Sequence, residues 1–331
     1  MRCGAMVELK NISFRYGSEN TVSKYADCLR NINLTVKTGE FILLTGPSGC
    51  GKTTILRIIN GLIPQFYPGE VTGEIFIDGE SVKEHELYDT ALIIGTVFQN
   101  PRTQFYNVDT TGELAFGCEN RGLSKQEIYA RIDSTVADFH MGVLMDRSIF
   151  RLSDGEKQKI ACASVNVSEP KIILLDEPSA NLDYDSTLML RKLILRWKSE
   201  GKTIIAAEHR IAYLWDIIDR AVIMQNGEII REFTEDEKDM LTQNDLQKMG
   251  LRTTVMESPV DIQMEAFQDG DSPITLRNFH FTYRGEKKNI VDIPMLQIAA
   301  GQISAIAGAN GAGKTSFLNC LCGLEKHCKG T

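Results

Sequence analysis

The chain has 331 residues, of which 43% are hydrophobic and 24% are charged, values typical of a folded globular protein rather than a disordered or fibrous one. Its 36 Lys and Arg residues against 44 Asp and Glu residues give a net charge of −8, which argues against nucleic acid as a partner. The longest apolar runs are as long as a strand and far shorter than the roughly 20 residues that cross a bilayer, so a role at a membrane would require partner subunits.

The first predicted elements are strand-like sequence directly after residues 1–6, a buried strand over residues 41–45 and a glycine-rich loop over residues 46–53 with the sequence GPSGCGKT. This loop has the pattern of a phosphate-binding loop, and it stands between an apolar strand and a helical pattern, as such a loop requires. Glycines let successive N–H groups turn toward phosphate oxygens, and the positive end of the following helix adds to them. Lys52 would bring a positive charge to the β- and γ-phosphates, and Thr53 a hydroxyl to Mg²⁺. A glycine-rich turn that binds nothing is the alternative, and a second copy of the pattern argues against it.

An apolar strand predicted over residues 171–175 ends in two carboxylates. Asp176 suits a metal ligand, and Glu177 suits a general base or a group that orients water. Such an ending is common, so it gains weight only from neighbouring motifs. Further buried strands are predicted over residues 203–207 and 221–224, separated by helical patterns. This alternation indicates a parallel sheet, whose C-terminal ends collect the catalytic loops.

Four more motifs surround these elements: residues 97–101 (VFQNP), 152–158 (LSDGEKQ), 179–183 (SANLD) and 208–210 (EHR). In this order and at this spacing they resemble the Q-loop, signature motif, D-loop and switch histidine of the ATP-binding cassette (ABC) family. Each motif alone has an ordinary structural explanation, such as a packing or surface histidine. The resemblance implies an α/β fold, a P-loop NTPase domain of the ABC type. This domain has a parallel-sheet core, an antiparallel β subdomain and an α-helical signature subdomain, and the start of a second copy follows it.

The resemblance also implies which residues bind and hydrolyse ATP. The implied catalytic residues are the base Glu177, the γ-phosphate ligand His209, Lys52 and Gln99. The implied Mg²⁺ ligands are Thr53, Gln99, Asp176 and Thr315. The residues expected to contact ATP are the adenine-stacking Tyr16 and Tyr283, the first loop Gly46, Pro47, Ser48, Gly49, Cys50, Gly51, Lys52, Thr53 and Thr54, the signature residues Ser153, Gly155 and Glu156, and the second loop Gly308, Ala309, Asn310, Gly311, Ala312, Gly313, Lys314, Thr315 and Ser316.

An internal repeat divides the chain into two domains. The segment over residues 9–16 returns over residues 276–283, and the phosphate loop returns over residues 308–315. Between the copies, residues 232–272 carry 11 acidic and 3 basic residues, which predicts a solvated, partly helical linker. The second copy stops where the first reaches a predicted strand, which suggests truncation inside the second domain. The predicted organisation is a first nucleotide-binding domain over 1–231, an acidic linker over 232–272 and an incomplete second domain over 273–331.

The signature motif departs from the resembled family at two positions. Asp154 stands where a small residue is usual, and its carboxylate would repel a triphosphate unless it points away or pairs with a cation. Glu156 replaces the commoner glutamine. In the family, each ATP lies between the phosphate loop of one domain and the signature of another. Completing both sites therefore implies a second nucleotide-binding domain, from the missing C-terminal part or from another chain.

A narrower resemblance is to the ATPases of energy-coupling factor transporters, which import vitamins, cobalt or nickel. It is carried by residues 61–64 (GLIP), 68–73 (PGEVTG), 100–105 (NPRTQF) and 113–117 (ELAFG). The resemblance implies a transmembrane coupling subunit and a substrate-binding membrane subunit as partners. It implies ATP and Mg²⁺ as cofactors and a peripheral location on the cytoplasmic face of the cell membrane. The absence of a secretory signal from residues 1–6 and the 8 scattered cysteines also favour a reducing, cytosolic location.

Other functions remain as alternatives. A soluble double-cassette ATPase of translation or DNA repair would favour a basic arm or a long coiled-coil insertion, and the sequence has neither pattern. A P-loop kinase or GTPase would need neither the signature motif nor the switch histidine. The cluster Cys320, Cys322, His327 and Cys328 could suggest zinc, but positions 320 and 322 would face different sides of a helix, so helix packing is preferred.

Overall fold

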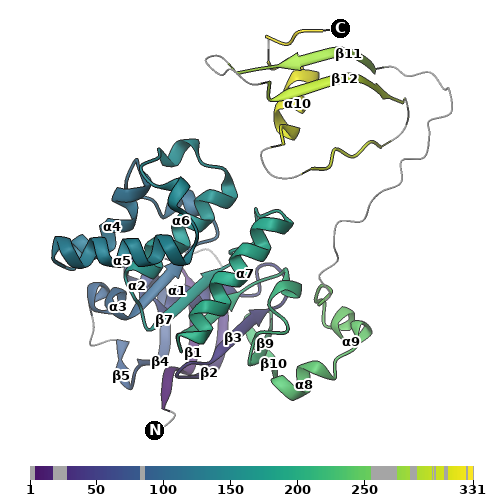
Figure 1. Ribbon diagram of the computed structural model, residues 1–331. Helices are drawn as coiled ribbons and strands as arrows, with labels where there is room; N and C mark the ends of the chain where they lie inside the picture. The colour runs from purple at the N-terminus through teal and green to yellow at the C-terminus, as the bar shows by residue number, and fades with distance from the viewer. Residues whose placement is uncertain are drawn as a thin grey trace. The chain divides into compact units, whose positions relative to one another are not determined.

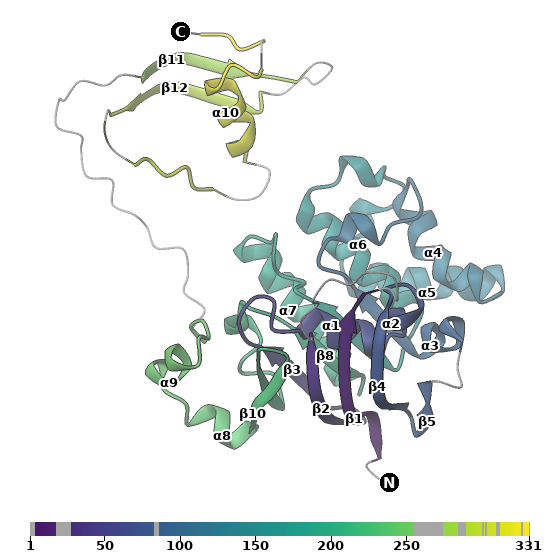
Figure 2. The same ribbon diagram turned by 180° about the vertical axis from the view of Figure 1, so that it is seen from behind.

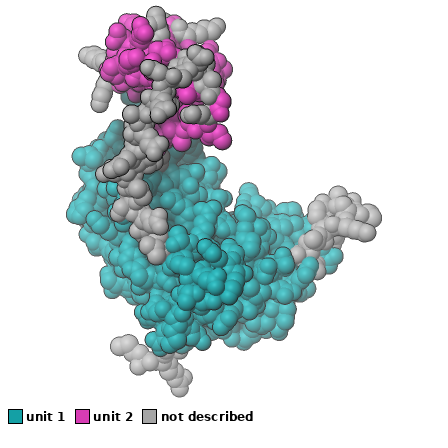
Figure 3. Space-filling view, turned by 90° about the vertical axis from the view of Figure 1, so that its right-hand side faces the viewer, with its two compact units in different colours: residues 1–256 teal, residues 257–331 magenta. Residues whose placement is uncertain are grey.

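A computed structural model describes residues 4–17, 28–82, 86–254, 274–283, 289–299, 301, 303–308, 312–325 and 327–330. The chain divides into two compact units, residues 1–256 and residues 257–331 (Figure 3). The strands of the first unit are β1 (Ala5–Tyr16), β2 (Leu29–Lys37), β3 (Phe41–Thr45), β4 (Gly69–Ile77), β5 (Glu80–Ser81), β6 (Ile94–Val97), β7 (Ile172–Asp176), β8 (Thr203–Ala207), β9 (Arg220–Gln225) and β10 (Glu228–Thr234). Its α-helices are α1 (Lys52–Ile59), α2 (Leu62–Gln65), α3 (Leu87–Ile93), α4 (Thr110–Asn120), α5 (Lys125–Asp138), α6 (Asp154–Val167), α7 (Tyr184–Ser199), α8 (Glu235–Asp239) and α9 (Gln243–Lys248). Short 3₁₀ turns are η2 (Pro101–Thr103), η3 (Gly142–Leu144), η4 (Ile149–Arg151) and η5 (Ile211–Tyr213).

The centre of the first unit is a six-stranded sheet in the order β10-β9-β3-β8-β7-β6. Strands β9, β3, β8, β7 and β6 pair in parallel, and β10 pairs with β9 antiparallel. Every residue of β3, β7 and β8 is buried. Successive side chains of a strand point to opposite faces, so each of these strands contributes to two cores. In β3, for example, Phe41 and Leu43 join one core, and Ile42 and Leu44 join the other.

Each face of this sheet is covered by a different layer. Helix α1 and an antiparallel sheet in the order β2-β1-β4-β5 contribute to one core. Figure 2 shows β2, β1 and β4 of this sheet side by side. Helices α4, α5 and α6, which pack against one another, and α7 contribute to the other core (Figure 1). The parallel core, the antiparallel β part and the helical part of the predicted ABC-type domain are therefore all present.

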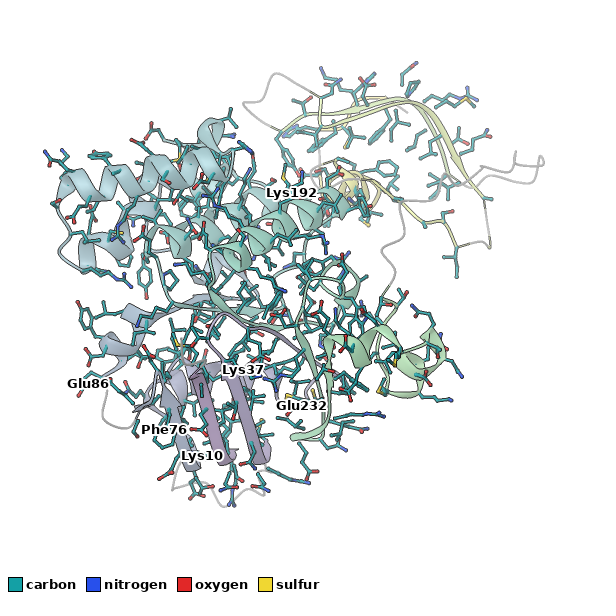
Figure 4. The ribbon with its side chains drawn as sticks, turned by 60° about the horizontal axis from the view of Figure 1, so that its bottom comes forward. Lys10, Lys37, Phe76, Glu86, Lys192 and Glu232 are labelled. Atoms are coloured by element: carbon teal, nitrogen blue, oxygen red, sulfur yellow. The ribbon has the colours of Figure 1, made fainter. Side chains whose placement is uncertain are left out.

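The antiparallel sheet carries charged side chains on its exposed surface. Lys10 of β1 lies with its ammonium 4.7 Å from the centroid of the Phe76 ring of β4, a cation–π contact (Figure 4). Lys10 also pairs with Glu8 at 3.1 Å. The opposite side of β1 is apolar, with Val7 and Leu9 buried in the core. This alternation of exposed charge and buried apolar side chains is the pattern of a sheet with one solvated face.

The structure corrects the predicted boundary at residue 231. Strand β10 continues to Thr234, and residues 232–254 pack on the first unit rather than forming a solvated linker. The side chains of Phe233, Leu246 and Leu251 are buried in the core that contains the helices. Lys238 of α8 is 1% exposed, and its Nζ donates to the carbonyl oxygen of Trp215 at 2.6 Å. The remainder of the predicted linker, residues 255–272, lies outside the described residues.

The second unit contains an antiparallel pair, β11 (Ile274–Phe281) and β12 (Val291–Ile298), and helix α10 (Lys314–Leu321). Its small core consists of Leu276, Phe279, Phe281, Val291, Phe317 and Cys320. Cys320, in the last turn of α10, is buried, and Cys322, the C-cap residue after the helix ends, is exposed. In the described parts of both units, no group of three or more His, Cys, Asp and Glu side chains is placed to hold a metal ion. None of the described helices combines the length and the hydrophobicity of a transmembrane segment.

Candidate functional site

The glycine-rich loop connects β3 to α1 at the carboxyl end of the parallel strands. Gly46, Gly49 and Gly51 have φ angles of 145°, 77° and 108°, a region that favours glycine. A Cβ atom on Gly46 would lie 2.1 Å from the carbonyl oxygen of Met224, so the loop runs against β9 with no room for a side chain. Gly51 is the N-cap of α1, and no acidic side chain stands in the first turn of that helix. The positive end of α1 therefore faces the loop without a carboxylate from the first turn of the helix itself.

Lys52 folds back over the loop. Its side chain is buried, and its Nζ donates to the carbonyl oxygens of Gly46 and Pro47, both at 3.1 Å. The same Nζ lies 3.2 Å from Nε2 of His209, which comes from the loop after β8. The structure therefore brings the predicted lysine and the predicted switch histidine together at the mouth of the loop.

Thr53 and Asp176 also meet at this site. The Thr53 hydroxyl donates to Oδ1 of Asp176 at 2.8 Å. Burial raises the pKa of the Asp176 carboxyl, and the nearby Glu177 charge adds to this rise, while the Thr53 hydrogen bond and the cations Arg57 and Lys52 oppose it. A hydroxyl and a carboxylate side by side are the oxygen ligands that Mg²⁺ prefers, so this pair fits the predicted metal. Gln99, the third predicted ligand in this domain, contacts Glu177 rather than the Thr53–Asp176 pair.

We expect Asp176→Asn to stabilise the nucleotide-free protein at pH 7. Because the pKa of Asp176 is raised in the folded state, its ionised form lowers the free energy of unfolding above that pKa, and the effect disappears as the pH falls below the unfolded value of about 4. Urea unfolding at several pH values should show that the variant has a higher free energy of unfolding than the wild type, and that this difference increases with pH. Asp216→Asn is the matched control, because the Arg191 hydrogen bond lowers the pKa of Asp216 and the change should destabilise. A destabilised Asp176→Asn variant at pH 7 would contradict the expectation.

Glu177 follows β7 directly and lies between two polar partners. Its Oε1 is 3.0 Å from Nε2 of His209, and its Oε2 accepts a hydrogen bond from Nε2 of Gln99 at 3.0 Å. Its φ angle of 42° lies in the left-handed region, which is uncommon for a residue with a side chain, and its N–H donates to the carbonyl oxygen of Ala207. Burial lowers the pKa of His209, with a contribution from Lys52. The imidazole is therefore mainly neutral at neutral pH.

The signature residues lie at the start of α6. Ser153 is the N-cap, and Glu156 completes a capping box by accepting from the Ser153 N–H at 2.7 Å. Asp154 pairs with two cations, Arg102 at 3.3 Å and Lys157 at 3.6 Å. Of the two arrangements that the sequence left open for Asp154, pairing with a cation is the one adopted. The two positive charges offset the field of its carboxylate.

The segment after β6 contacts α6 at a second point, in addition to the Arg102–Asp154 pair. The Gln104 side chain accepts from the N–H of Phe98 at 3.2 Å and donates to the carbonyl oxygen of Ala161 at 3.2 Å. Next to these contacts is a cavity of about 330 Å³ whose walls include Gln99, Arg102, Asp154, Gln158, Asn181 and Leu182. The Q-loop, signature and D-loop segments that the sequence identified separately are thus neighbours in space.

The second unit repeats the local contacts of the first loop. Lys314 Nζ donates to the carbonyl oxygen of Gly308 at 2.6 Å, as Lys52 Nζ does to Gly46, and Gly313 caps α10 with a φ angle of 87°. The predicted residues Ala309, Asn310 and Gly311 lie outside the described residues, whereas Ala312 and Thr315 are described.

The two predicted adenine-stacking tyrosines have matching surroundings. Tyr16 OH lies 3.2 Å from Thr54 Oγ1, and Tyr283 OH lies 3.0 Å from Ser316 Oγ. Each ring also packs edge-on against the phenylalanine two residues before it in the chain, with centroids 4.5 Å and 4.8 Å apart. The two tyrosines therefore have equivalent contacts, and their role toward adenine stays a prediction.

Two residues with extensive contacts have no role assigned by the sequence motifs. Arg102 holds Asp154, and Glu208 receives hydrogen bonds from several loops. A signal existed for Glu208, because it directly follows the apolar strand β8 in the same way as Glu177 follows β7. No local pattern marks Arg102, because its partner is 52 residues away.

Comparison with known proteins identifies the relatives of the chain. The ABC transporter family model matches residues 29–180 and 291–331. A putative ABC transporter ATP-binding protein of Treponema denticola is 42% identical over 332 residues, which cover 98% of this chain and 66% of the relative. A putative ABC transporter ATP-binding protein of Pyrococcus abyssi is 38% identical over 230 residues, 69% of this chain and 80% of the relative. The chain thus spans about two thirds of the length of the Treponema relative.

Solved structures with a similar fold include the cbiO1 protein of Clostridium perfringens, described as part of the ABC transporter complex cbiONQ. Its TM-score is 0.63 and its identity 27%, with 74% of this chain and 93% of that chain covered. The dimeric ATP-binding cassette MJ0796 in a post-hydrolysis state with ADP and Pi has a TM-score of 0.59 and an identity of 28%, with 70% of this chain and 99% of that chain covered.

Proposed function

This chain belongs to the family of ABC transporter ATP-binding proteins and contains an ABC ATPase domain, and from this membership we propose that it drives a membrane importer of the energy-coupling factor type. In this proposal the complete protein binds and hydrolyses ATP, and the released energy serves the uptake of a vitamin or a metal ion. The observation that carries the proposal is the convergence of Lys52, Asp176, Glu177 and His209 at one glycine-rich loop.

The contacts of the site support a division of roles during hydrolysis. Lys52 exchanges its hydrogen bonds to the loop carbonyls for bonds to phosphate oxygens, which keeps its buried ammonium paired. Thr53 and Asp176 would hold Mg²⁺, which when bound offsets the negative charge that the phosphates carry. Glu177 orients the attacking water and accepts its proton, and His209 contacts the γ-phosphate. Gln99 holds the Glu177 carboxylate from the opposite side.

We further propose that the partners are a transmembrane coupling subunit, a substrate-binding membrane subunit and a second nucleotide-binding domain. The solved cbiO1 protein, part of the cbiONQ complex, and the dimeric MJ0796 cassette support such an assembly. The loop of the second unit, with the Lys314 and Tyr283 contacts that match those of the first, supports a second phosphate-binding domain within this protein. The location that follows from these partners is the cytoplasmic face of the membrane.

Calorimetry tests whether the protein binds ATP, and co-purification tests separately whether it works with a membrane subunit. The protein should release or absorb heat on titration with Mg·ATP, and Lys52→Ala should weaken the affinity about tenfold or more, because it removes a charge-assisted phosphate contact. The matched control, Lys159→Ala, changes a lysine that donates to the His140 carbonyl in the helical part. The complete protein isolated from detergent-treated membranes should carry an integral membrane subunit with it. No heat with Mg·ATP would reject ATP binding, and recovery without any membrane subunit would reject transport.

A further inference from the structure

A single buried carboxylate connects the two loops that carry Glu177 and His209. Glu208 is 1% exposed and directly follows β8. Its Oε1 accepts the backbone N–H groups of His209 at 2.8 Å and Arg210 at 3.0 Å. Its Oε2 accepts the hydroxyl and the N–H of Ser179, at 2.8 and 3.3 Å, and the hydroxyl of Tyr213 at 3.0 Å. One oxygen therefore holds the His209 loop, and the other holds the segment two residues after Glu177.

All of these neighbours donate hydrogen bonds to Glu208, so its position requires a side chain that only accepts hydrogen bonds. An ionised carboxylate has about four acceptor sites on two oxygens, whereas a glutamine of the same shape turns an NH₂ group toward one of the two sets of donors. The charge also acts on Tyr213, since burial first and then the Glu208 charge raise the pKa of its phenol well above the usual value. Tyr213 therefore remains protonated, and so a hydrogen-bond donor, at neutral pH.

Arg210 also connects the loop after β8 to the loop after β7. Its guanidinium donates to the carbonyl oxygens of Ser179 and Leu182, both at 3.0 Å. Together with the N–H of Glu177 on the Ala207 carbonyl oxygen, these bonds fix the loop after β7 against the loop after β8. The contact between Glu177 Oε1 and His209 Nε2, at 3.0 Å, is formed between these two fixed loops.

We propose that Glu208 is a positioning residue for ATP hydrolysis, which sets the distance between Glu177 and His209 by holding both of their loops on one carboxylate. The proposal rests on the function proposed above and adds a residue that does not itself touch the nucleotide. Because Glu208 acts only through the reacting groups, its removal should slow the chemical step and leave nucleotide affinity unchanged.

The decisive variant is Glu208→Gln in the complete protein. We expect kcat for ATP to fall about 10- to 100-fold, the cost of misplacing a catalytic group, with the Kd for Mg·ATP within about threefold of the wild-type value. Glu200→Gln, an exposed residue at the end of α7, is the matched control and should leave both values unchanged. Ser179→Ala removes one hydroxyl donor while the carboxylate keeps its other bonds, and it should lower kcat by a smaller factor. It provides the test if Glu208→Gln fails to fold by near-ultraviolet circular dichroism.

Combination with Glu177→Gln separates positioning from a general loss of stability. If Glu208 acts through Glu177, the double variant Glu177→Gln/Glu208→Gln should hydrolyse ATP no more slowly than Glu177→Gln alone. Multiplicative losses, a wild-type kcat in both Glu208→Gln and Ser179→Ala, or a weaker Kd with unchanged kcat would each overturn the inference. A wild-type protein that neither binds nor hydrolyses ATP would instead reject the proposed function.

Discussion

Glu177→Gln is expected to bind ATP with wild-type affinity and to hydrolyse it on the order of 10² to 10³ times more slowly. The amide has the size of the carboxylate and suits the same backbone, whose φ angle of 42° is unaffected by the change. It cannot accept a proton from water, and its NH₂ group would face either Gln99 or His209, whose side chains contact one carboxylate oxygen each. The loss should therefore appear in kcat rather than in the Kd.

Single-turnover hydrolysis and equilibrium nucleotide binding, measured on the same preparation, check this expectation. Glu235→Gln, in the first turn of the short helix α8, provides a control with the same chemical change far from the loop. Turnover at the wild-type rate would show that Glu177 is not the base. A loss of ATP affinity equal to the loss of rate would assign Glu177 to binding instead.

Gly46→Ala should abolish nucleotide binding and destabilise the first unit by about 3 kcal/mol. The added Cβ would lie 2.1 Å from the carbonyl oxygen of Met224 and 3.2 Å from Sγ of Cys50. The φ angle of Gly46, 145°, is also unfavourable for alanine. Because the obstructing atom belongs to the backbone of β9 in the central sheet, the loop has to move instead. A displaced loop no longer directs its N–H groups toward phosphate.

Gly49→Ala separates the steric effect from the conformational one. Gly49 has a φ angle of 77°, and a Cβ atom there would meet no atom within 4 Å. This variant should lose only about 1 to 2 kcal/mol, the cost of a left-handed conformation for alanine. Urea unfolding and calorimetry with Mg·ATP on both variants make the comparison. Equal losses of stability at the two positions would contradict the close packing of Gly46 on β9.

Four of the six strands of the central sheet, and the phosphate loop, were predictable from local patterns, whereas β6 and β10 were not among the predicted strands. Strand β3 and strand β8 have the predicted bounds, and β7 and β9 differ from them by one residue at each shifted end. Strands buried on both faces read as continuous apolar runs bounded by polar residues, which local sequence reveals directly. The phosphate loop was equally predictable, since glycines at fixed spacing before a lysine are typical of a single loop conformation.

Contacts between distant residues were not predictable in the same way. The acidic composition of residues 232–254 indicated a linker, but Phe233, Leu246 and Leu251 anchor this segment in a core formed by other elements. Three apolar residues spread over about twenty positions give no periodic signal. Arg102 and Asp154 illustrate the same limit, because the sequence left open whether Asp154 pairs with a cation and only the fold places Arg102 3.3 Å from it.

The attachment of the segment after β6 to α6 has a mechanical consequence. Gln104 is bonded near the middle of the helix, at Ala161, and Arg102 at its first residue, Asp154. An α-helix is stiff along its axis, and these two anchors are separated by about 10 Å of it. We expect a displacement of the segment after β6 to be transmitted through both contacts to α6, and so to its N-cap residue Ser153.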